Sequence, residues 1–185
     1  MPAALDYESI AKQIHEFYRE KYQGTTHYEE LAEFMKVDNR EAAYRIGKVL
    51  SMAGLRLEPL AKDETWTAED QQSVRGIITD NLEVLAETEH EGWMEARIRQ
   101  GWVKADHVNR DRKESHLLVP YAEFEKVIAM KQEVAGPAVI KPGTAEEREL
   151  TLAEEIEHEK NKDRDAVSYY VGIIAETQYR IIEES

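Results

Sequence analysis

The sequence has no cysteine and no long apolar run. The absence of thiols excludes disulfides and a cysteine nucleophile, and nothing points to an oxidising compartment. No stretch approaches the roughly 18 to 20 apolar residues that a membrane helix needs. Residues 1–6 lack the basic flank and apolar run of a signal peptide. We therefore expect a cytoplasmic protein.

Positive charge is scarce, because 24 Lys and Arg stand against 38 Asp and Glu and give a net charge of −14. A field of that sign repels nucleic acid and anionic lipid, so binding to either is not expected. Catalytic signatures are also missing, since there is no P-loop, no Gly-x-Gly-x-x-Gly and no nucleophile elbow. We expect no enzyme, no cofactor and no metal site.

Apolar residues make up 42% of the 185 residues, enough for one large or two small domains with a hydrophobic core. Spacings of three and four between them predict helices, with Asp6, Asn39 and Asp163 as N-caps and Thr67 with Asp70 as a capping box. The expected helices run from residue 7 to a break at 24–26 and over residues 28–35, 40–53, 67–99 and 163–175, and the expected strands cover 55–57 and 179–181. Residues 102–119 are expected as a hairpin or irregular loop, and 136–143 as an exposed loop. The predicted fold class is mainly α with short β strands.

The two halves of the chain resemble each other in residue type at fixed spacing. Residues 39–57 align with 163–181 without a gap, and 15–18 align with 90–93. Each copy is then a helix, a connection and a capped helix that leads into a strand. One such unit is too small to enclose a core, so the repeat predicts two copies packed with a pseudo-twofold relation.

The second copy carries the most specific motifs: Leu85-Ala86, His90-Glu91-Gly92-Trp93, Gly101-Trp102, Leu118-Val119-Pro120-Tyr121 and Lys160-Asn161-Lys162-Asp163-Arg164. This pattern resembles the repeat (RyR) domain of ryanodine receptors, which also occurs in bacterial and phage proteins. The resemblance covers residues 82–182 and extends weakly to 7–58, where the Gly-Trp and Leu-Val-Pro-Tyr elements are missing. The chain departs from the family at Lys104-Ala105, in place of an aromatic and a glycine, and at His116-Leu117, in place of His-Pro.

The resemblance implies a division of the chain and a function. Residues 1–60 would be a divergent, shortened repeat, 61–80 a connector with the start of a helix, and 81–185 a RyR repeat domain with a loop insertion at 125–155. The themes of the family are sensing of nucleotide-like ligands and allosteric modulation, and these are what it implies here.

Residues 97–113, hereafter the basic segment, are the clearest local anomaly in charge. Six Lys and Arg residues stand there against two Asp, a local charge of +4 within an acidic chain. Trp93 precedes the segment and Trp102 lies within it. Arg pairs with phosphate and an indole stacks on a base, so the combination suits a flat anion. The alternative is a solvated basic loop that its Trp residues anchor to the core.

The hypothesis that follows is a non-enzymatic module that senses or sequesters a small anionic, nucleotide-like ligand in a basic, Trp-containing pocket of the second repeat. Its predicted ligand-binding residues are Trp93, Arg97, Trp102, Lys104, Arg110, Arg112, Lys113, His116, Tyr121 and Arg164. The alternative function is an interaction module that docks an acidic protein partner. An enzyme acting on a nucleotide ranks third, and a protein effector and a homo-oligomer are left open.

Structural roles compete with the functional ones at several of these positions. Arg40 and Arg164 hold the same place in the two copies, which favours a salt bridge near a helix start over an anion site. His15 and His90 are followed by Glu but lack the second His of His-Glu-x-x-His, so a hydrogen bond such as one to a carbonyl is favoured over metal binding. Tyr121 is favoured as a packing residue.

Overall fold

The computed structural model describes residues 4–185, and this part of the chain is mainly helical with short strands, as predicted. The strands pair into two-stranded sheets. The chain divides into two compact units, one built from residues up to 93 together with 164–185, and the other from 94–163. The second unit is thus inserted into the sequence of the first. No helix in the described range is long and apolar enough to cross a membrane.

The first unit is closed by residues from both ends of the chain. Its elements are α1 (Tyr7–Lys21), η1 (Tyr28–Glu30), α2 (Glu33–Ser51), β1 (Leu55–Pro59), α3 (Ala68–Asp80), the first part of α4 (Leu82–Arg99), the end of α6 (Leu152–Ser168), α7 (Tyr170–Ala175) and β6 (Tyr179–Glu183). The predicted cap of α1 is confirmed, because Asp6 Oδ1 accepts a hydrogen bond from the Ser9 amide at 3.1 Å. The capping box that opens α3 is confirmed as well.

The core of the first unit joins its early helices to its last elements. Ile10, Leu50, Leu85 and Ile174 are all fully buried in one cluster. Each belongs to an apolar face that the three- and four-residue spacing predicted. The core therefore draws on α1, α2, α4 and α7 together.

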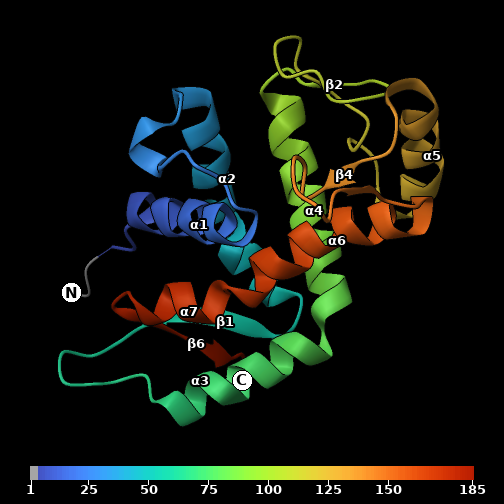
Figure 1. Ribbon diagram of the computed structural model, residues 1–185. Helices are drawn as coiled ribbons and strands as arrows, with labels where there is room; N and C mark the ends of the chain where they lie inside the picture. Colours follow the sequence, from blue (N-terminus) through green and yellow to red (C-terminus); the bar gives the residue numbers. More distant parts are fainter. Residues whose placement is uncertain (1–3) are drawn as a thin grey trace. The chain divides into compact units, whose positions relative to one another are not determined.

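Both predicted strands are confirmed, and they pair with each other. β1 and β6 run antiparallel, as Figure 1 shows, with Leu57 opposite Ile181. Gly54 takes φ +67° in the turn between α2 and β1, a conformation that glycine adopts without strain. Leu57 and Ile181 are also the residues that the internal repeat aligns. The pseudo-twofold two-repeat arrangement itself stays a prediction.

The second unit has a smaller core of its own. Its elements are the end of α4, β2 (Val103–Lys104), β3 (Glu114–Ser115), η2 (Tyr121–Glu123), α5 (Phe124–Ala135), β4 (Val139–Ile140), β5 (Arg148–Glu149) and the start of α6. Val119, Tyr121, Phe124, Val127 and Ile128 form its buried cluster. Residues 125–155, which the resemblance implied as a loop insertion, contain most of α5 and the β4–β5 hairpin.

Three predicted helix boundaries are wrong. α2 starts at Glu33 and continues through Asn39, whose side-chain amide donates to the Met35 carbonyl at 3.0 Å within the helix instead of capping it. α6 starts at Leu152 and continues through Asp163, so Asp163 is not a cap either. The single helix expected over 67–99 is two helices, because α3 ends at Asp80 with Asn81 as its C-cap and α4 starts at Leu82.

Candidate functional site

The basic segment leaves the last turn of α4 and forms a compact loop within the second unit. The Val103 amide donates to the Lys113 carbonyl at 2.9 Å, and Asn109 and Glu114 exchange two amide–carbonyl hydrogen bonds, each of 2.9 Å. β2 and β3 pair in parallel over two residues. Residues 102–119, predicted as a hairpin or irregular loop, form a loop held by main-chain hydrogen bonds, and the parallel pairing of β2 with β3 is not that of a hairpin.

Four cations of the basic segment are exposed on this loop: Lys104, Arg110, Arg112 and Lys113. Their local partners are few. The Lys104 ammonium lies 3.6 Å from the Glu123 carboxylate, and the Arg112 guanidinium lies 3.2 Å from Glu114 with its own side chain 72% exposed. Arg110 has no side-chain hydrogen bond or ion pair with residues 4–185. Exposed ion pairs of this kind are weak, so these charges stay available to an anion.

The two indoles are engaged by neighbouring side chains. Trp102 is 6% exposed, and the Arg97 guanidinium carbon lies 4.1 Å from its ring centroid, a cation–π contact. Trp93 belongs to the first unit, where it is partly buried and stacks on the buried His90 with ring centroids 5.4 Å apart. Each indole thus has a protein group stacked on it.

Tyr121 and His116 are buried in the second unit. The Tyr121 hydroxyl donates to Asp163 Oδ2 at 2.6 Å, and the Lys160 ammonium lies over its ring. His116 is 4% exposed, and neither of its ring nitrogens has a hydrogen-bond partner among residues 4–185. Burial lowers the pKa of His116, which favours the neutral ring.

Arg164 and Arg40 form the ion pairs that the structural alternative predicted, both within the first unit. Arg164 is bidentate to Glu83, with N–O distances of 2.7 and 3.0 Å, and Arg40 binds Glu8 at 2.6 Å and also Glu33. Arg164 is therefore already engaged by a carboxylate. Both arginines lie inside helices rather than beside an N-cap.

The carbonyl hydrogen bond predicted for the paired histidines is found at His15. Its Nε2 lies 2.8 Å from the Thr26 carbonyl oxygen, which ties α1 to the loop that follows it. Within residues 4–185, no group of His, Cys, Asp or Glu side chains is arranged to hold a metal ion.

Sequence reasoning missed a buried ionic cluster that joins α2, α4 and α7. Arg45 donates to both oxygens of Glu89, at 2.9 and 2.6 Å, and the Tyr170 hydroxyl donates to Glu89 at 2.9 Å. Burial and the neighbouring Glu89 charge raise the pKa of Tyr170 well above its ordinary value. The one local signal was Gly92, where an added Cβ would lie 2.6 Å from Arg45 Cδ.

A second buried carboxylate, Glu155, organises the other unit. Glu155 is 1% exposed and accepts hydrogen bonds from Lys131, from Gln132 at 2.7 Å and from the Ala138 amide at 3.0 Å. Those donors outweigh burial and leave the pKa of Glu155 below its ordinary value. Among 38 acidic residues, no sequence pattern distinguishes this one.

Taken together, the ten predicted ligand-binding residues do not line one surface of the second unit. Trp93 and Arg164 belong to the first unit, and Arg97, Trp102, His116 and Tyr121 are wholly or partly buried. Of the ten, the four that the second unit leaves exposed are the loop cations Lys104, Arg110, Arg112 and Lys113.

Comparison with known proteins supports the family resemblance for part of the chain. The family model of the RyR domain matches residues 69–135, which run from α3 to the end of α5. The match includes the basic segment and the His-Glu-Gly-Trp, Gly-Trp and Leu-Val-Pro-Tyr motifs. No curated protein matches the chain.

Proposed function

Because residues 69–135 match the RyR domain, we propose that the chain is a non-enzymatic binding module, and that the basic segment docks an acidic protein partner. The observation that carries the proposal is the exposure of Lys104, Arg110, Arg112 and Lys113 on one hydrogen-bonded loop of a chain whose net charge is −14. A cationic loop on an acidic protein attracts a partner of opposite charge and orients it during encounter.

An acidic protein fits this loop better than a nucleotide does. The predicted nucleotide pocket relies on an indole face that a base can stack on, and Trp102 is buried beneath Arg97. The exposed cations supply charge without such a face. Carboxylates on a protein surface need only the charge and the Arg donors.

The small nucleotide-like ligand is the second candidate, and one observation favours it. His116 lies in the matched region, and both of its ring nitrogens are buried without a partner in the part of the chain that the structure describes, whereas buried polar groups normally have one. A ligand that reaches His116 would supply one. Chemical-shift changes of the His116 ring signals in an NMR titration with nucleotides would support this candidate.

The two candidates are separated by one set of titrations. The probe for the first is a fluorescein-labelled peptide of alternating Glu and Ser, followed by anisotropy at low salt and at about 0.15 M salt. The probe for the second is a panel of mono-, di- and cyclic nucleotides, followed by calorimetry. We expect the acidic peptide to bind in a salt-sensitive manner, and added nucleotide not to displace it.

The matched variants are Arg110→Glu with Arg112→Glu, and Lys62→Glu as the control. Lys62 is exposed in the first unit and has no side-chain partner in the described structure. Reversing two loop charges should weaken peptide binding at least about tenfold, whereas the control should change it little. Equal affinity of both variants would refute docking on the basic segment. Trp102→Ala is a poor test because it empties a buried site.

A further inference from the structure

A hollow of about 240 Å³ lies in the first unit, between α3 and β6, whereas the basic segment belongs to the second unit. α3 packs directly against β6, and a water in the liquid occupies about 30 Å³, so the hollow holds on the order of eight water-sized groups. That is the size of a small molecule rather than of a chain segment. Its lining consists of Trp66, Asp70, Ser73, Val74, Ile77, Arg180, Ile181, Ile182 and Glu183.

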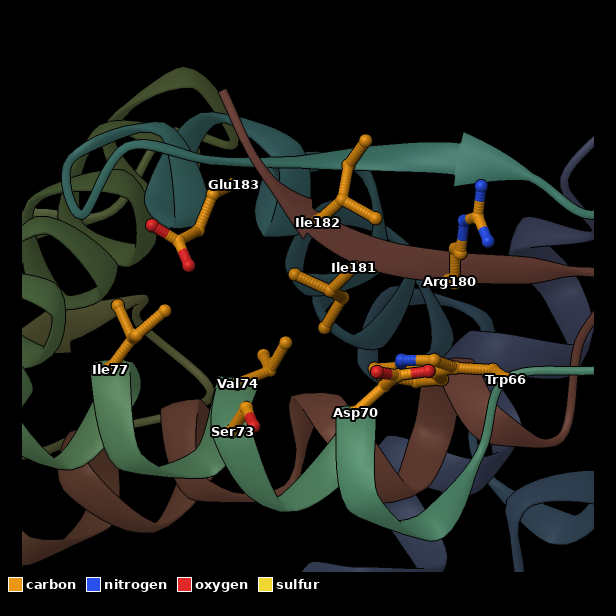
Figure 2. A pocket seen from close by; sticks show the side chains of 9 residues that line it. All are labelled: Trp66, Asp70, Ser73, Val74, Ile77, Arg180, Ile181, Ile182 and Glu183. Carbon is orange, nitrogen blue, oxygen red and sulfur yellow. The ribbon is translucent and has the colours of Figure 1, made fainter. Parts of the chain in front are cut away.

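The hollow is elongated along the strand. Figure 2 shows α3 and β6 running alongside each other, with Asp70 opposite Arg180 at one end and Ile77 opposite Glu183 at the other. Seven helical residues and three strand residues separate these positions, and each separation covers roughly 10 Å. A small molecule that reaches both ends is therefore linear.

The middle of the hollow is apolar. Trp66, Val74 and Ile181 are 6%, 5% and 1% exposed. The Ser73 hydroxyl also lines the hollow, but it donates to the Glu69 carbonyl at 3.2 Å, so its proton is already committed. Methylene groups of a ligand laid against this wall would be removed from water, which favours binding.

Each end of the hollow carries an exposed carboxylate. At one end, Asp70 Oδ2 accepts a hydrogen bond from the Thr67 hydroxyl at 2.7 Å, and Oδ1 has no partner among residues 4–185. At the other end, the Glu183 side chain makes no hydrogen bond or ion pair with the described residues. Both carboxylates can therefore accept hydrogen bonds from a ligand.

Arg180 does not neutralise the carboxylate that lies opposite it. Its guanidinium binds Glu58, at 2.9 and 2.5 Å, and also Glu64. Figure 2 shows this guanidinium on the side of β6 that is turned away from α3. The hollow thus keeps a negative charge at each end, and a ligand that complements it has a cation at each end.

The apolar wall between the two carboxylates distinguishes this site from the rest of the acidic surface. A net charge of −14 attracts small cations in general. A metal ion or a single ammonium would pair with one carboxylate and leave the wall in contact with water. A chain of methylene groups with an ammonium at each end uses the wall and both carboxylates.

We propose that the hollow binds a linear aliphatic diamine. The methylene chain lies against Trp66 and Val74, and one ammonium lies beside each of Asp70 and Glu183. The site uses none of the residues of the basic segment, so it is independent of the docking of an acidic partner.

The test is an NMR titration of the full chain with hexamethylenediamine at low salt, followed at the Trp66 indole signal. We expect a dissociation constant below about 1 mM, and unchanged signals of Trp93 and Trp102, which do not line the hollow. Hexylamine lacks one ammonium, and ethylenediamine lacks most of the methylene chain. Each should bind at least about threefold more weakly, the effect of losing one exposed ion pair or the apolar contact.

Two pairs of variants locate the site. Glu183→Gln should weaken binding of hexamethylenediamine at least about threefold. Glu184→Gln makes the same charge change at the neighbouring exposed residue, which does not line the hollow, and should leave binding unchanged. Ser73→Arg adds a cation in the hollow and should also weaken binding, whereas Gln72→Arg, outside the lining, should not. Thermal unfolding of all four variants checks that the fold is intact.

The proposal is overturned if hexamethylenediamine leaves the Trp66 signal unchanged at millimolar concentration, or if hexylamine or ethylenediamine binds as tightly. Equal affinity within either pair of variants also overturns it, because the diamine would then be held by the general negative charge of the protein and not by this hollow.

Discussion

At the scale of single residues, Gly92 allows the buried ion pair of the first unit to form. Its missing Cβ leaves room for the Arg45 side chain, which would otherwise meet that atom at 2.6 Å. Arg45 cannot swing aside cheaply, because both of its hydrogen bonds to Glu89 would break and leave a carboxylate that is 4% exposed without its cation. The Arg45–Glu89 ion pair therefore depends on a glycine at position 92.

We predict that Gly92→Ala lowers the free energy of unfolding by about 1–3 kcal/mol, the usual cost of overpacking. Gly76→Ala is the matched control, because Gly76 lies in α3 with open space around its Cβ position. The gain in helix propensity should raise the stability of that variant by roughly 0.5–1 kcal/mol. Urea unfolding of both measures the difference, and a stabilised Gly92→Ala protein would show that Arg45 is free to move.

Glu16 makes the stability of the first unit depend on pH in the acid range. Its hydrogen bond with Arg19, at 2.6 Å, is the main cause that lowers the pKa of Glu16 from 4.5 to about 2, and the Tyr28 amide adds a second hydrogen bond. A folded-state pKa below the unfolded value stabilises the fold above pH 4.5, and this contribution is lost as pH falls toward 2.

We therefore predict that Glu16→Gln is less stable than the natural protein at neutral pH. The difference between their free energies of unfolding should narrow as pH falls from 4.5 to 2. Chemical unfolding across this range measures the gap. Glu20→Gln removes an exposed carboxylate from the same helix and should show no comparable narrowing. A gap that stays constant with pH would mean that the Glu16 pair does not form in solution.

At the scale of elements, the sequence predicted those features that depend on contacts between residues close together in the chain. The Asp6 cap, the Thr67 capping box and the alternating residues at 55–57 and 179–181 act within a few residues, and all are confirmed. Asn39 and Asp163 are not caps, since α2 and α6 begin upstream of them; the Asn39 side chain bonds to the preceding turn, and that of Asp163 bonds to Tyr121 from a distant element.

The candidate site divides in the same way. Exposure of the loop cations follows from their charge density, which is visible in sequence. Burial of Trp102 beneath Arg97 depends on how α4 and the following loop fold together, and no spacing rule encodes it.

At this scale we predict that Glu155→Ala destabilises the second unit by about 3–5 kcal/mol, because Lys131, Gln132 and the Ala138 amide lose their shared acceptor. Hydrogen exchange should show lost protection at α5 and the β4–β5 hairpin, with less effect in the first unit. Glu133→Ala, an exposed position on α5, is the control. Unchanged protection of the hairpin would mean that apolar contacts hold it without Glu155.

At the scale of the whole molecule, the first unit is discontinuous in sequence. Residues 94–163 separate its early elements from the end of α6, α7 and β6, yet Ile174 and Ile181 belong to the same buried cluster as Ile10 and Leu50. The second unit, by contrast, is contiguous. Neither arrangement was visible in the repeat, which predicted a division near residues 60 to 80.

During synthesis, β1 leaves the ribosome well before β6, the strand that pairs with it. At about 5–20 residues per second, the intervening stretch takes several seconds to translate. The contiguous unit can fold in that interval, while the apolar faces of α1 and α2 wait for Ile174 and Ile181 to cover them. Nascent chains are thus most exposed to chaperones and proteases before residues 164–185 emerge, and a frameshift in that segment would leave the apolar faces of α1 and α2 uncovered.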